Sequence, residues 1–263
     1  MVVRLGVIGG GNMGAALVGG LLASGWAPSD LAVVEVLEAR RHELTAMFPG
    51  VSVTATTDGL RLAAALIAVK PHDVPAAVAA VVGAGAGRVL SIAAGVTLAT
   101  LEASAGSAAV VRAMPNTPAL VGEGAAAIAA GSSAGDDDLA WAEEILGSVG
   151  TVVRVAERHL DAVTGLAGSG PAYVFLMAEA LIDAGVTAGL PRATSEALVT
   201  QLLVGSAALL RERGEPATLR AMVTSPGGTT AAGLRVLEEH AVRSAVIEAV
   251  AAATRRSIEL GTA

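Results

Sequence analysis

The stretch VVRLGVIGGGNMGAALVGGLLASG, Val2 to Gly25, decides the fold of this chain. It opens with an apolar run from Val2 to Ile8, which is typical of a short buried strand. A glycine turn follows, and an apolar pattern with helical spacing then continues from about Met13 to Ser24. The stretch therefore predicts a strand, a tight turn and a helix in direct succession.

Three glycines in this turn, Gly9, Gly11 and Gly14, fill the spacing G-x-G-x-x-G. In a dinucleotide-binding turn the first glycine permits the turn and the second lets a pyrophosphate approach the backbone. The third lets the helix pack closely on the strand. The spacing alone is a weak signal, but a second apolar run, LAVVEV, carries the acidic Glu35 about 20 residues beyond the third glycine, where such folds contact a ribose. The turn therefore predicts a dinucleotide site.

Further apolar runs read as strands, and helical stretches separate most of them. They are Ala65 to Val69, Arg88 to Ala94, Ala108 to Pro115, Gly124 to Gly131 and Gly150 to Val155. Strands that alternate with helices predict a mainly parallel sheet covered on both faces, which binds ligands beyond the carboxyl ends of its strands. We therefore expect an α/β Rossmann-type dinucleotide-binding domain over residues 1–156.

Residues that follow the strands are the candidates for contact with the cofactor. Lys70 is either a ribose or phosphate contact or an ordinary surface lysine. The small residues from Ala93 to Gly95 leave space for a nicotinamide ribose, although they also suit close packing. Two prolines fix the loop around Asn116 and Thr117, whose side chains are placed to face the cleft. Arg112 is either an ion-pair residue or a support for this loop.

The choice between NADH and NADPH depends on the end of the second strand. A carboxylate there accepts hydrogen bonds from the ribose of NAD and repels the additional phosphate of NADP, so Glu35 favours NADH. Arg40 and Arg41 favour NADPH weakly, because both are expected on the next helix rather than in the turn. The sequence leaves the preference open.

Composition limits the class of partner. A net charge of −7 and a pI near 5.1 argue against nucleic acid or an anionic membrane surface. The chain has no cysteine, and its four histidines show no ligand spacing, so we expect no metal site. The uncharged segment from Leu5 to Ser29 is too rich in glycine for a membrane-spanning helix. A soluble, cytoplasmic protein that binds a small ligand is the expectation.

The second half of the chain has helical periodicity and no strand-like runs, so we expect an all-helical domain over residues 157–263. Breaks in the helices are expected at Gly168 to Pro171 and at Gly189 to Pro191. Asp161 and Ser169 either line a cleft or cap a helix. Because this domain is strongly apolar, part of its surface is expected to be buried against a second subunit.

Motifs along nearly the whole chain resemble those of the pyrroline-5-carboxylate reductase family. They are VIGGGNMG, AVKP, SIAAGVTLATLE, VRAMPNTPALVGEG, DAVTGLAGSGPAYVFLMAEALIDAGVTAGLPR and TSPGGTTAAGLRVLE. The resemblance implies reduction of 1-pyrroline-5-carboxylate to L-proline by NADPH or NADH, the last step of proline biosynthesis. It also implies an all-α dimerisation domain that forms a homodimer by interleaving helices with its partner, and often a ring of dimers.

The resemblance also implies the site residues. Together with Glu35 and Asn116 from the strand ends, the expected cofactor-binding residues are Ile8, Gly9, Gly10, Gly11, Asn12, Met13, Glu35, Ala68, Val69, Lys70, Pro71, Ala93, Ala94, Gly95 and Asn116. The expected substrate loop is Ser225, Gly227, Gly228, Thr229 and Thr230. Thr230 takes the place of the threonine whose hydroxyl meets the ring nitrogen. The chain departs from the family at Glu35, where a small or basic residue is common, and at Ala167, where serine is frequent.

Reduction of a protonated cyclic imine mostly requires that two reactants be positioned and that the nitrogen be hydrogen-bonded. Such a reaction does not demand a histidine–carboxylate pair, a thiol or a metal. We expect the backbone N–H groups of Gly228, Thr229 and Thr230 to hold the substrate carboxylate, and the Thr230 hydroxyl to contact the ring nitrogen.

Two alternatives remain at this point. A relative that acts on another imine or on a 3-hydroxy acid is one, although a hydroxy-acid dehydrogenase needs a base such as lysine in the helical domain, and no lysine follows Lys70. A non-catalytic dinucleotide-binding regulatory protein is the other. It would keep the glycine turn but leaves the sequence SPGGTT, from Ser225 to Thr230, without a role.

Overall fold

The computed structural model describes residues 2–262, which form two compact units. The first, here called the sheet unit, runs to Ser169 and also includes the residues from Ala251 onward. The second, the helical unit, is Gly170–Val250. The end of the chain thus belongs with the sheet, whereas the sequence placed all residues after 156 in one helical domain. The domain bounds 1–156 and 157–263 stay a prediction.

The sheet unit is built on one eight-stranded sheet in the order β3-β2-β1-β4-β5-β6-β7-β8. Its strands are β1 (Leu5–Ile8), β2 (Leu31–Val34), β3 (Ser52–Thr54), β4 (Ala64–Ile67), β5 (Arg88–Ser91), β6 (Ala109–Met114), β7 (Gly124–Ala130) and β8 (Gly150–Arg154). Neighbouring strands are parallel except β6 and β7. The strand order reverses at β1, which has β2 on one side and β4 on the other, and ligands bind doubly wound sheets at such a point. The expected Rossmann-type sheet is confirmed.

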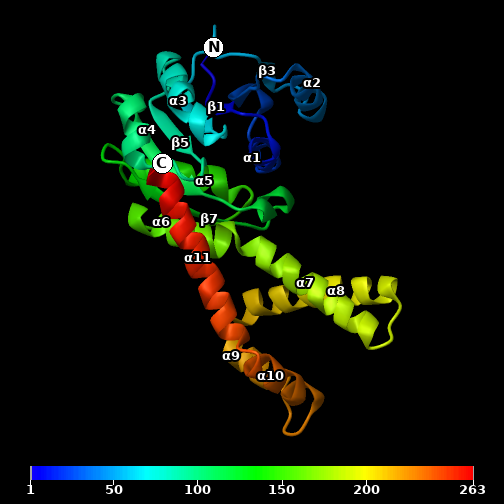
Figure 1. Ribbon diagram of the computed structural model, residues 1–263. Coiled ribbons are helices and arrows are strands. Elements are labelled where there is room, and N and C mark those ends of the chain that lie inside the picture. The colour runs from blue at the N-terminus through cyan, green and yellow to red at the C-terminus, as the bar shows by residue number, and fades with distance from the viewer. Residues whose placement is uncertain (1, 263) are drawn as a thin grey trace. The chain divides into compact units, whose positions relative to one another are not determined.

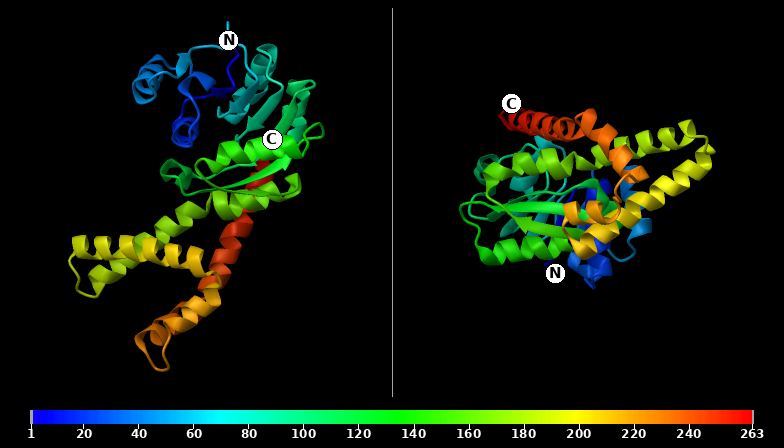
Figure 2. Two further views of the ribbon diagram at one scale, coloured as in Figure 1. Left: turned by 180° about the vertical axis from the view of Figure 1, so that it is seen from behind. Right: turned by 90° about the horizontal axis from the view of Figure 1, so that it is seen from below.

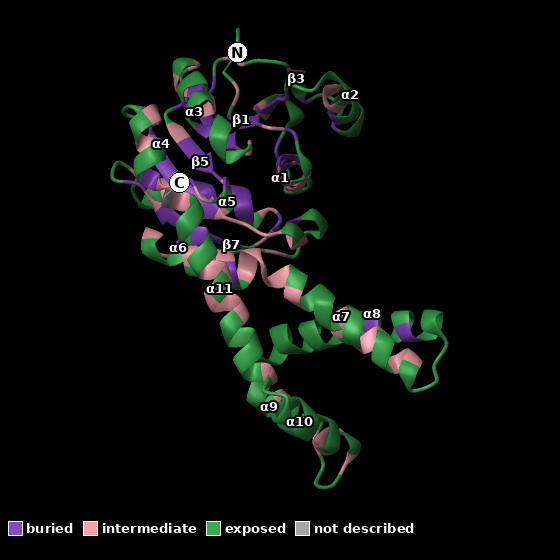
Figure 3. Cartoon of the chain, viewed as in Figure 1, coloured by how far each residue is buried: buried purple, intermediate pink, exposed green. Residues whose placement is uncertain are grey.

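Helices cover both faces of this sheet (Figure 1). They are α1 (Asn12–Ala23), η1 (Pro28–Asp30), α2 (Glu38–Met47), η2 (Pro71–Asp73), α3 (Val74–Gly83), α4 (Leu98–Ala105), η3 (Thr117–Val121), α5 (Asp136–Gly147), η4 (Glu157–His159), α6 (Leu160–Val163) and η5 (Thr164–Gly168). Residues of α1, α2 and α5 form one buried cluster with Leu5 and Val7 of β1. Residues of α3, α4 and α6 form the other with Ile8. Side chains that alternate along the strand therefore supply both cores, and buried residues concentrate in the strands (Figure 3).

The expected strands are all present, and most end a few residues before the apolar run does. The sequence did not predict β3, which has only three residues. It pairs with β2 alone, at the edge of the sheet, and none of its residues is fully buried. So short an edge strand carries too little apolar alternation to be recognised.

The helical unit contains α7 (Gly170–Thr187), α8 (Arg192–Arg213), α9 (Pro216–Met222), α10 (Thr229–Glu239) and the start of α11 (Val242–Thr262). Helices α7 and α8 pack side by side as a hairpin (Figure 2). Gly189, at a φ of +98°, makes the turn between them, which confirms the expected break at this point. The Ser195 hydroxyl fastens the hairpin by donating to the Ile182 carbonyl at 2.8 Å.

Much of the apolar surface of this hairpin is exposed in the single chain (Figure 3). Phe175, Leu176, Leu198 and Leu202 are each more than half exposed. By length and composition alone, α8 and the helix that includes α7 are long and apolar enough to cross a membrane. An apolar face of this extent is typical of a surface that a partner covers.

The helical turns after Glu157 are interrupted within the range where a break was expected, Gly168 to Pro171. Thr164–Gly168 forms a π-helical turn, Ser169 is a bend, and α7 begins at Gly170. The Ser169 N–H reaches back five residues to the Thr164 carbonyl at 2.8 Å, which is the π-type bond.

Candidate functional site

The glycine turn joins β1 to α1, and each of its three motif glycines has a different structural role. Gly9 has a φ of +102°, and a Cβ atom there would lie 2.5 Å from the Ala68 carbonyl oxygen. A Cβ atom on Gly14 would lie 2.1 Å from the Gly9 carbonyl oxygen. A Cβ atom on Gly11 would meet nothing within 4 Å. The fold thus requires the first and third glycines, whereas the second borders open space, as a pyrophosphate contact needs.

A cavity of about 630 Å³, here called the dinucleotide cavity, lies at the carboxyl ends of β1, β2 and β4. Nine of the expected cofactor-binding residues line it: Ile8, Gly9, Gly11, Asn12, Met13, Glu35, Ala68, Val69 and Lys70. Gly14, Val34, Val36, Leu37 and Asp73 also line it and were not on the expected list. The N-terminus of α1 borders the cavity and has no acidic residue in its first turn, so its free N–H groups suit an anion.

Glu35 directly follows β2 and is 9% exposed. One carboxylate oxygen accepts from the N–H of Gly10 and the other from the N–H of Leu37, each at 2.9 Å. Gly10 does not line the cavity; its carbonyl accepts from Arg40 Nε at 2.7 Å. The acidic residue that was expected to meet the ribose therefore also fixes the glycine turn.

A second cavity of about 370 Å³, here called the C-terminal cavity, follows β4 and β5. It is lined by Pro71, Ala94, Gly95, Thr164, Ser169, Ala253, Arg256, Ser257 and Leu260. Lys70 lines the dinucleotide cavity and Pro71 lines this one, so the two cavities meet at one loop. The expected cofactor residues after β4 and β5 are thereby distributed over both.

The end of α11 forms one wall of the C-terminal cavity. Ser257 is 5% exposed, and its hydroxyl donates to the Asp161 carboxylate at 2.7 Å. Ser169 lines the cavity, whereas Asp161 holds the end of α11. The sequence did not identify Arg256, Ser257 or Leu260, because helical periodicity contains no signal for which distant element a helix packs against.

Two polar residues of β6 and the loop after it have partners within the chain. The Asn116 side chain donates to the Ala167 carbonyl and accepts from the Ala125 N–H at 2.8 Å. Arg112, with an 8% exposed side chain, donates to the Glu157 carboxylate at 2.9 Å, and so it is an ion-pair residue. Ala93 is buried and lines neither cavity. A cofactor contact by Asn116 or Ala93 stays a prediction.

The expected substrate loop lies in the helical unit and leads into α10. Gly227 has a φ of +69°, and a Cβ atom on Gly228 would lie 2.4 Å from the Ser225 hydroxyl oxygen. The Gly228 N–H donates to the Ser225 carbonyl at 3.0 Å, so the loop itself uses one of the three expected carboxylate donors. Thr229 and Thr230 begin the helix, where backbone N–H groups have no intrahelical partner.

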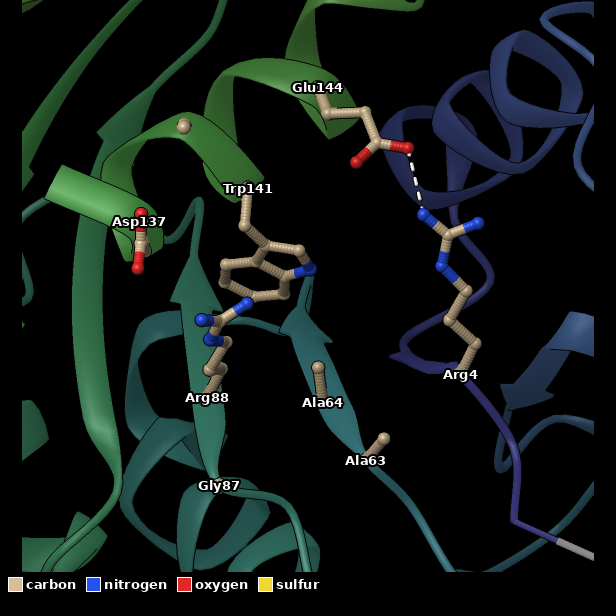
Figure 4. Close-up of a pocket in the computed structure, with 9 residues that line it drawn as sticks. Arg4, Ala63, Ala64, Gly87, Arg88, Asp137, Trp141 and Glu144 are labelled. Carbon is tan, nitrogen blue, oxygen red and sulfur yellow. Dashed lines mark hydrogen bonds and ion pairs between the residues drawn. The ribbon is translucent and has the colours of Figure 1, made fainter.

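Another hollow, of about 620 Å³, lies at the amino ends of β4 and β5 (Figure 4). Arg4 and Glu144 form an ion pair across it at 2.9 Å, and Arg88 pairs with Asp138 at 2.7 Å. Its two arginines are thus paired within the chain, and it is at the edge of the sheet opposite the switch point. Across the described residues, no group of three or more histidine or acidic side chains is arranged to hold a metal.

Residues 157–260 match the family described as pyrroline-5-carboxylate reductase dimerisation, and residues 4–95 match NADP oxidoreductase coenzyme F420-dependent. The pyrroline-5-carboxylate reductase of Synechocystis sp. is 48% identical, with 99% of each chain covered. The solved pyrroline-5-carboxylate reductase from Coxiella burnetii is 35% identical, with a TM-score of 0.92 over 99% of each chain. The enzyme from Plasmodium falciparum, solved with NADP bound, is 31% identical, with a TM-score of 0.84 over 98% of each chain.

Proposed function

Because the chain belongs to the pyrroline-5-carboxylate reductase family and is an NAD(P)H-dependent reductase of 1-pyrroline-5-carboxylate, we propose that its dinucleotide cavity holds the cofactor and its loop from Ser225 to Thr230 holds the substrate. The observation that carries this proposal is the open space at Gly11, beside the N-terminus of α1. Family membership removes the non-catalytic alternative.

The cofactor is proposed to extend along the carboxyl edge of the sheet. Its pyrophosphate lies at Gly11, where an anion meets the free N–H groups of α1. Its adenosine ribose lies toward Glu35, and its nicotinamide lies toward Ala94 and Gly95 in the C-terminal cavity. The chain's own contribution is to hold both ends of the cofactor, which itself supplies a hydride when bound. The meeting of the two cavities at Lys70 and Pro71 supports this path.

The substrate carries a carboxylate and a protonated ring nitrogen. Thr229 and Thr230, at the start of α10, are proposed to donate their N–H groups to the carboxylate, and the Thr230 hydroxyl is proposed to contact the nitrogen. Gly228 is left out of the expected donor set because its N–H already donates to Ser225. Orientation and a hydrogen bond suffice for an electrophile that is already charged.

Steady-state kinetics test the assignment of Thr230. A hydrogen bond to a charged group contributes on the order of 1.5–3 kcal/mol, so Thr230→Ala should lower kcat/KM by about 10- to 100-fold. Thr230→Ser keeps a hydroxyl and should retain most of the activity. Both variants should bind the dinucleotide as the wild type does, because Thr230 does not line the dinucleotide cavity. An unchanged kcat/KM in Thr230→Ala would exclude the assigned role.

The helical unit is proposed to form a homodimer, with the dimers arranged in a ring. The match of residues 157–260 to a dimerisation family and the exposed apolar face of α7 and α8 support the homodimer, whereas the ring rests on the resemblance to the family alone. The same pairing gives the two membrane-length helices a protein partner, so we propose a cytoplasmic enzyme rather than a membrane protein. Light scattering on the purified protein measures the number of copies.

A further inference from the structure

We infer that Glu35 makes this reductase select NADH over NADPH, by placing a negative charge where the 2′-phosphate of NADPH would lie. The inference rests on the proposed placement of the dinucleotide in its cavity. It concerns the turn after β2, which borders the adenosine end of that cavity. The two cofactors differ only in this phosphate, so the charges around this turn decide between them.

The Glu35 carboxylate is held firmly in place. Backbone N–H groups of Gly10 and Leu37 each donate to one of its oxygens at 2.9 Å. Each carboxylate oxygen has a second lone pair, so the side chain still accepts from the ribose hydroxyls of NADH. Since the residue is only 9% exposed, it has little room to swing away from an incoming phosphate. A fixed carboxylate accepts from a hydroxyl and repels a phosphate.

The residues that follow Glu35 in this turn include no cation that would offset its negative charge or bind a 2′-phosphate. Val36 and Leu37 follow Glu35 and are 79% and 65% exposed, which suits them to cover an adenine ring. Glu38 then begins α2 and does not line the cavity. Glu35 and two apolar residues thus occupy the positions at which a 2′-phosphate would require basic ones.

The nearest arginines are engaged elsewhere. Arg40 donates from Nε to the Gly10 carbonyl at 2.7 Å and from NH1 to Glu43 at 2.6 Å. Arg41 donates from NH1 to the carbonyls of Glu35 and Val36 at 3.0 and 2.8 Å. Neither arginine lines the dinucleotide cavity. Both guanidinium groups therefore support the backbone of the turn, and a phosphate would have to displace these bonds to be held by them.

Lys70 is the only cation among the described residues that line the cavity. It follows β4, which lies on the other side of β1 from β2. Asp73 lines the same part of the cavity, three residues further along. The positive charge is therefore on the pyrophosphate and nicotinamide side, away from Glu35.

The test compares kcat/KM with NADH and NADPH at saturating pyrroline-5-carboxylate, and compares the Kd values of NAD⁺ and NADP⁺ by calorimetry. Wild type should favour NADH over NADPH in kcat/KM, and NAD⁺ over NADP⁺ in Kd, by about tenfold or more, because a fixed carboxylate repels the 2′-phosphate. Glu35→Gln removes the charge at nearly constant shape and should reduce this ratio by about tenfold. Glu38→Gln is the matched control, because it makes the same charge change outside the cavity lining and should leave the ratio unchanged.

The measured quantity is the ratio of kcat/KM with NADH to kcat/KM with NADPH. If Glu35→Gln loosens the turn and thereby weakens the binding of both cofactors equally, this ratio does not change. If Glu35→Gln does not fold, the NADH/NADPH ratio of the wild type decides instead. This ratio should decrease at high salt, because salt screens the repulsion between Glu35 and the 2′-phosphate. Equal or better use of NADPH by wild type would overturn the inference while leaving the reductase activity intact. Selective binding of NAD⁺ without imine reduction would instead uphold the inference and refute the proposed placement of the substrate.

Discussion

The side-chain amide of Asn116 donates a 3.1 Å hydrogen bond to the carbonyl oxygen of Ala167. In a regular helix that oxygen would receive the N–H of residue 171, and Pro171 has none. Asn116 therefore supplies the missing donor from a different element, the loop after β6. The Asn116 amide thereby satisfies the Ala167 carbonyl, which lies in the π turn just before Pro171.

The first prediction concerns the stability that Asn116 provides. Asn116→Ala leaves the Ala167 carbonyl and the Ala125 N–H without this partner, and should lower the free energy of unfolding by about 1–3 kcal/mol. Asn116→Asp keeps the acceptor for Ala125 but sets a charged oxygen against the Ala167 carbonyl, so its loss should be at least as large. Urea unfolding measures both. Equal stability of the alanine variant and the wild type would show that the helix does not depend on this bond.

The second prediction separates two glycines of one turn. Gly11→Ala adds a methyl group to open space, so the variant should keep its Tm while its affinity for the dinucleotide falls by about tenfold or more. Gly14→Ala forces a methyl group against the Gly9 carbonyl and should lose about 2 kcal/mol of stability or more. Calorimetry of binding and of unfolding distinguishes them. A Gly11 variant that binds normally would place the pyrophosphate elsewhere.

The third prediction concerns the wall of the C-terminal cavity. Ser257→Ala removes the donor to Asp161 and should cost about 1–3 kcal/mol, with faster amide exchange in residues 251–262. The KM for the cofactor should rise, because this wall is proposed to border the nicotinamide. Ser133→Ala, at an exposed loop position, is the control. Unaltered exchange at the end of α11 would show that the hydroxyl does not hold it.

The sequence predicted those parts of the molecule that depend on local patterns. The strands, the glycine turn and the acidic residue after β2 each have a recognisable sequence signal, and the structure contains all of them. The edge strand β3 was missed because three half-polar residues carry no clear alternation. The break expected at Gly168 to Pro171 is present as a π turn followed by a bend at Ser169, but the hydrogen bond of this turn to Asn116 was not predictable, because Asn116 is distant in sequence.

The candidate site was likewise predictable only where it depends on local sequence patterns. Nine expected cofactor residues line one cavity because strand ends gather at one edge of a parallel sheet. The engagement of Arg40 and Arg41 with the turn was not predictable, since it depends on side-chain contacts between separate elements. The same holds for Arg256 and Ser257, which reach the cavity only through the packing of the end of α11.

The sheet unit is assembled from both ends of the chain, with Gly170–Val250 between them. During synthesis, a ribosome therefore releases the whole glycine turn and the sheet long before it releases Ser257 and Leu260, which complete the C-terminal cavity. The nascent protein passes through a stage with a nearly finished sheet but an unfinished C-terminal cavity. Removal of the residues from Ser257 onward would therefore take away one wall of the C-terminal cavity and leave the glycine turn in place.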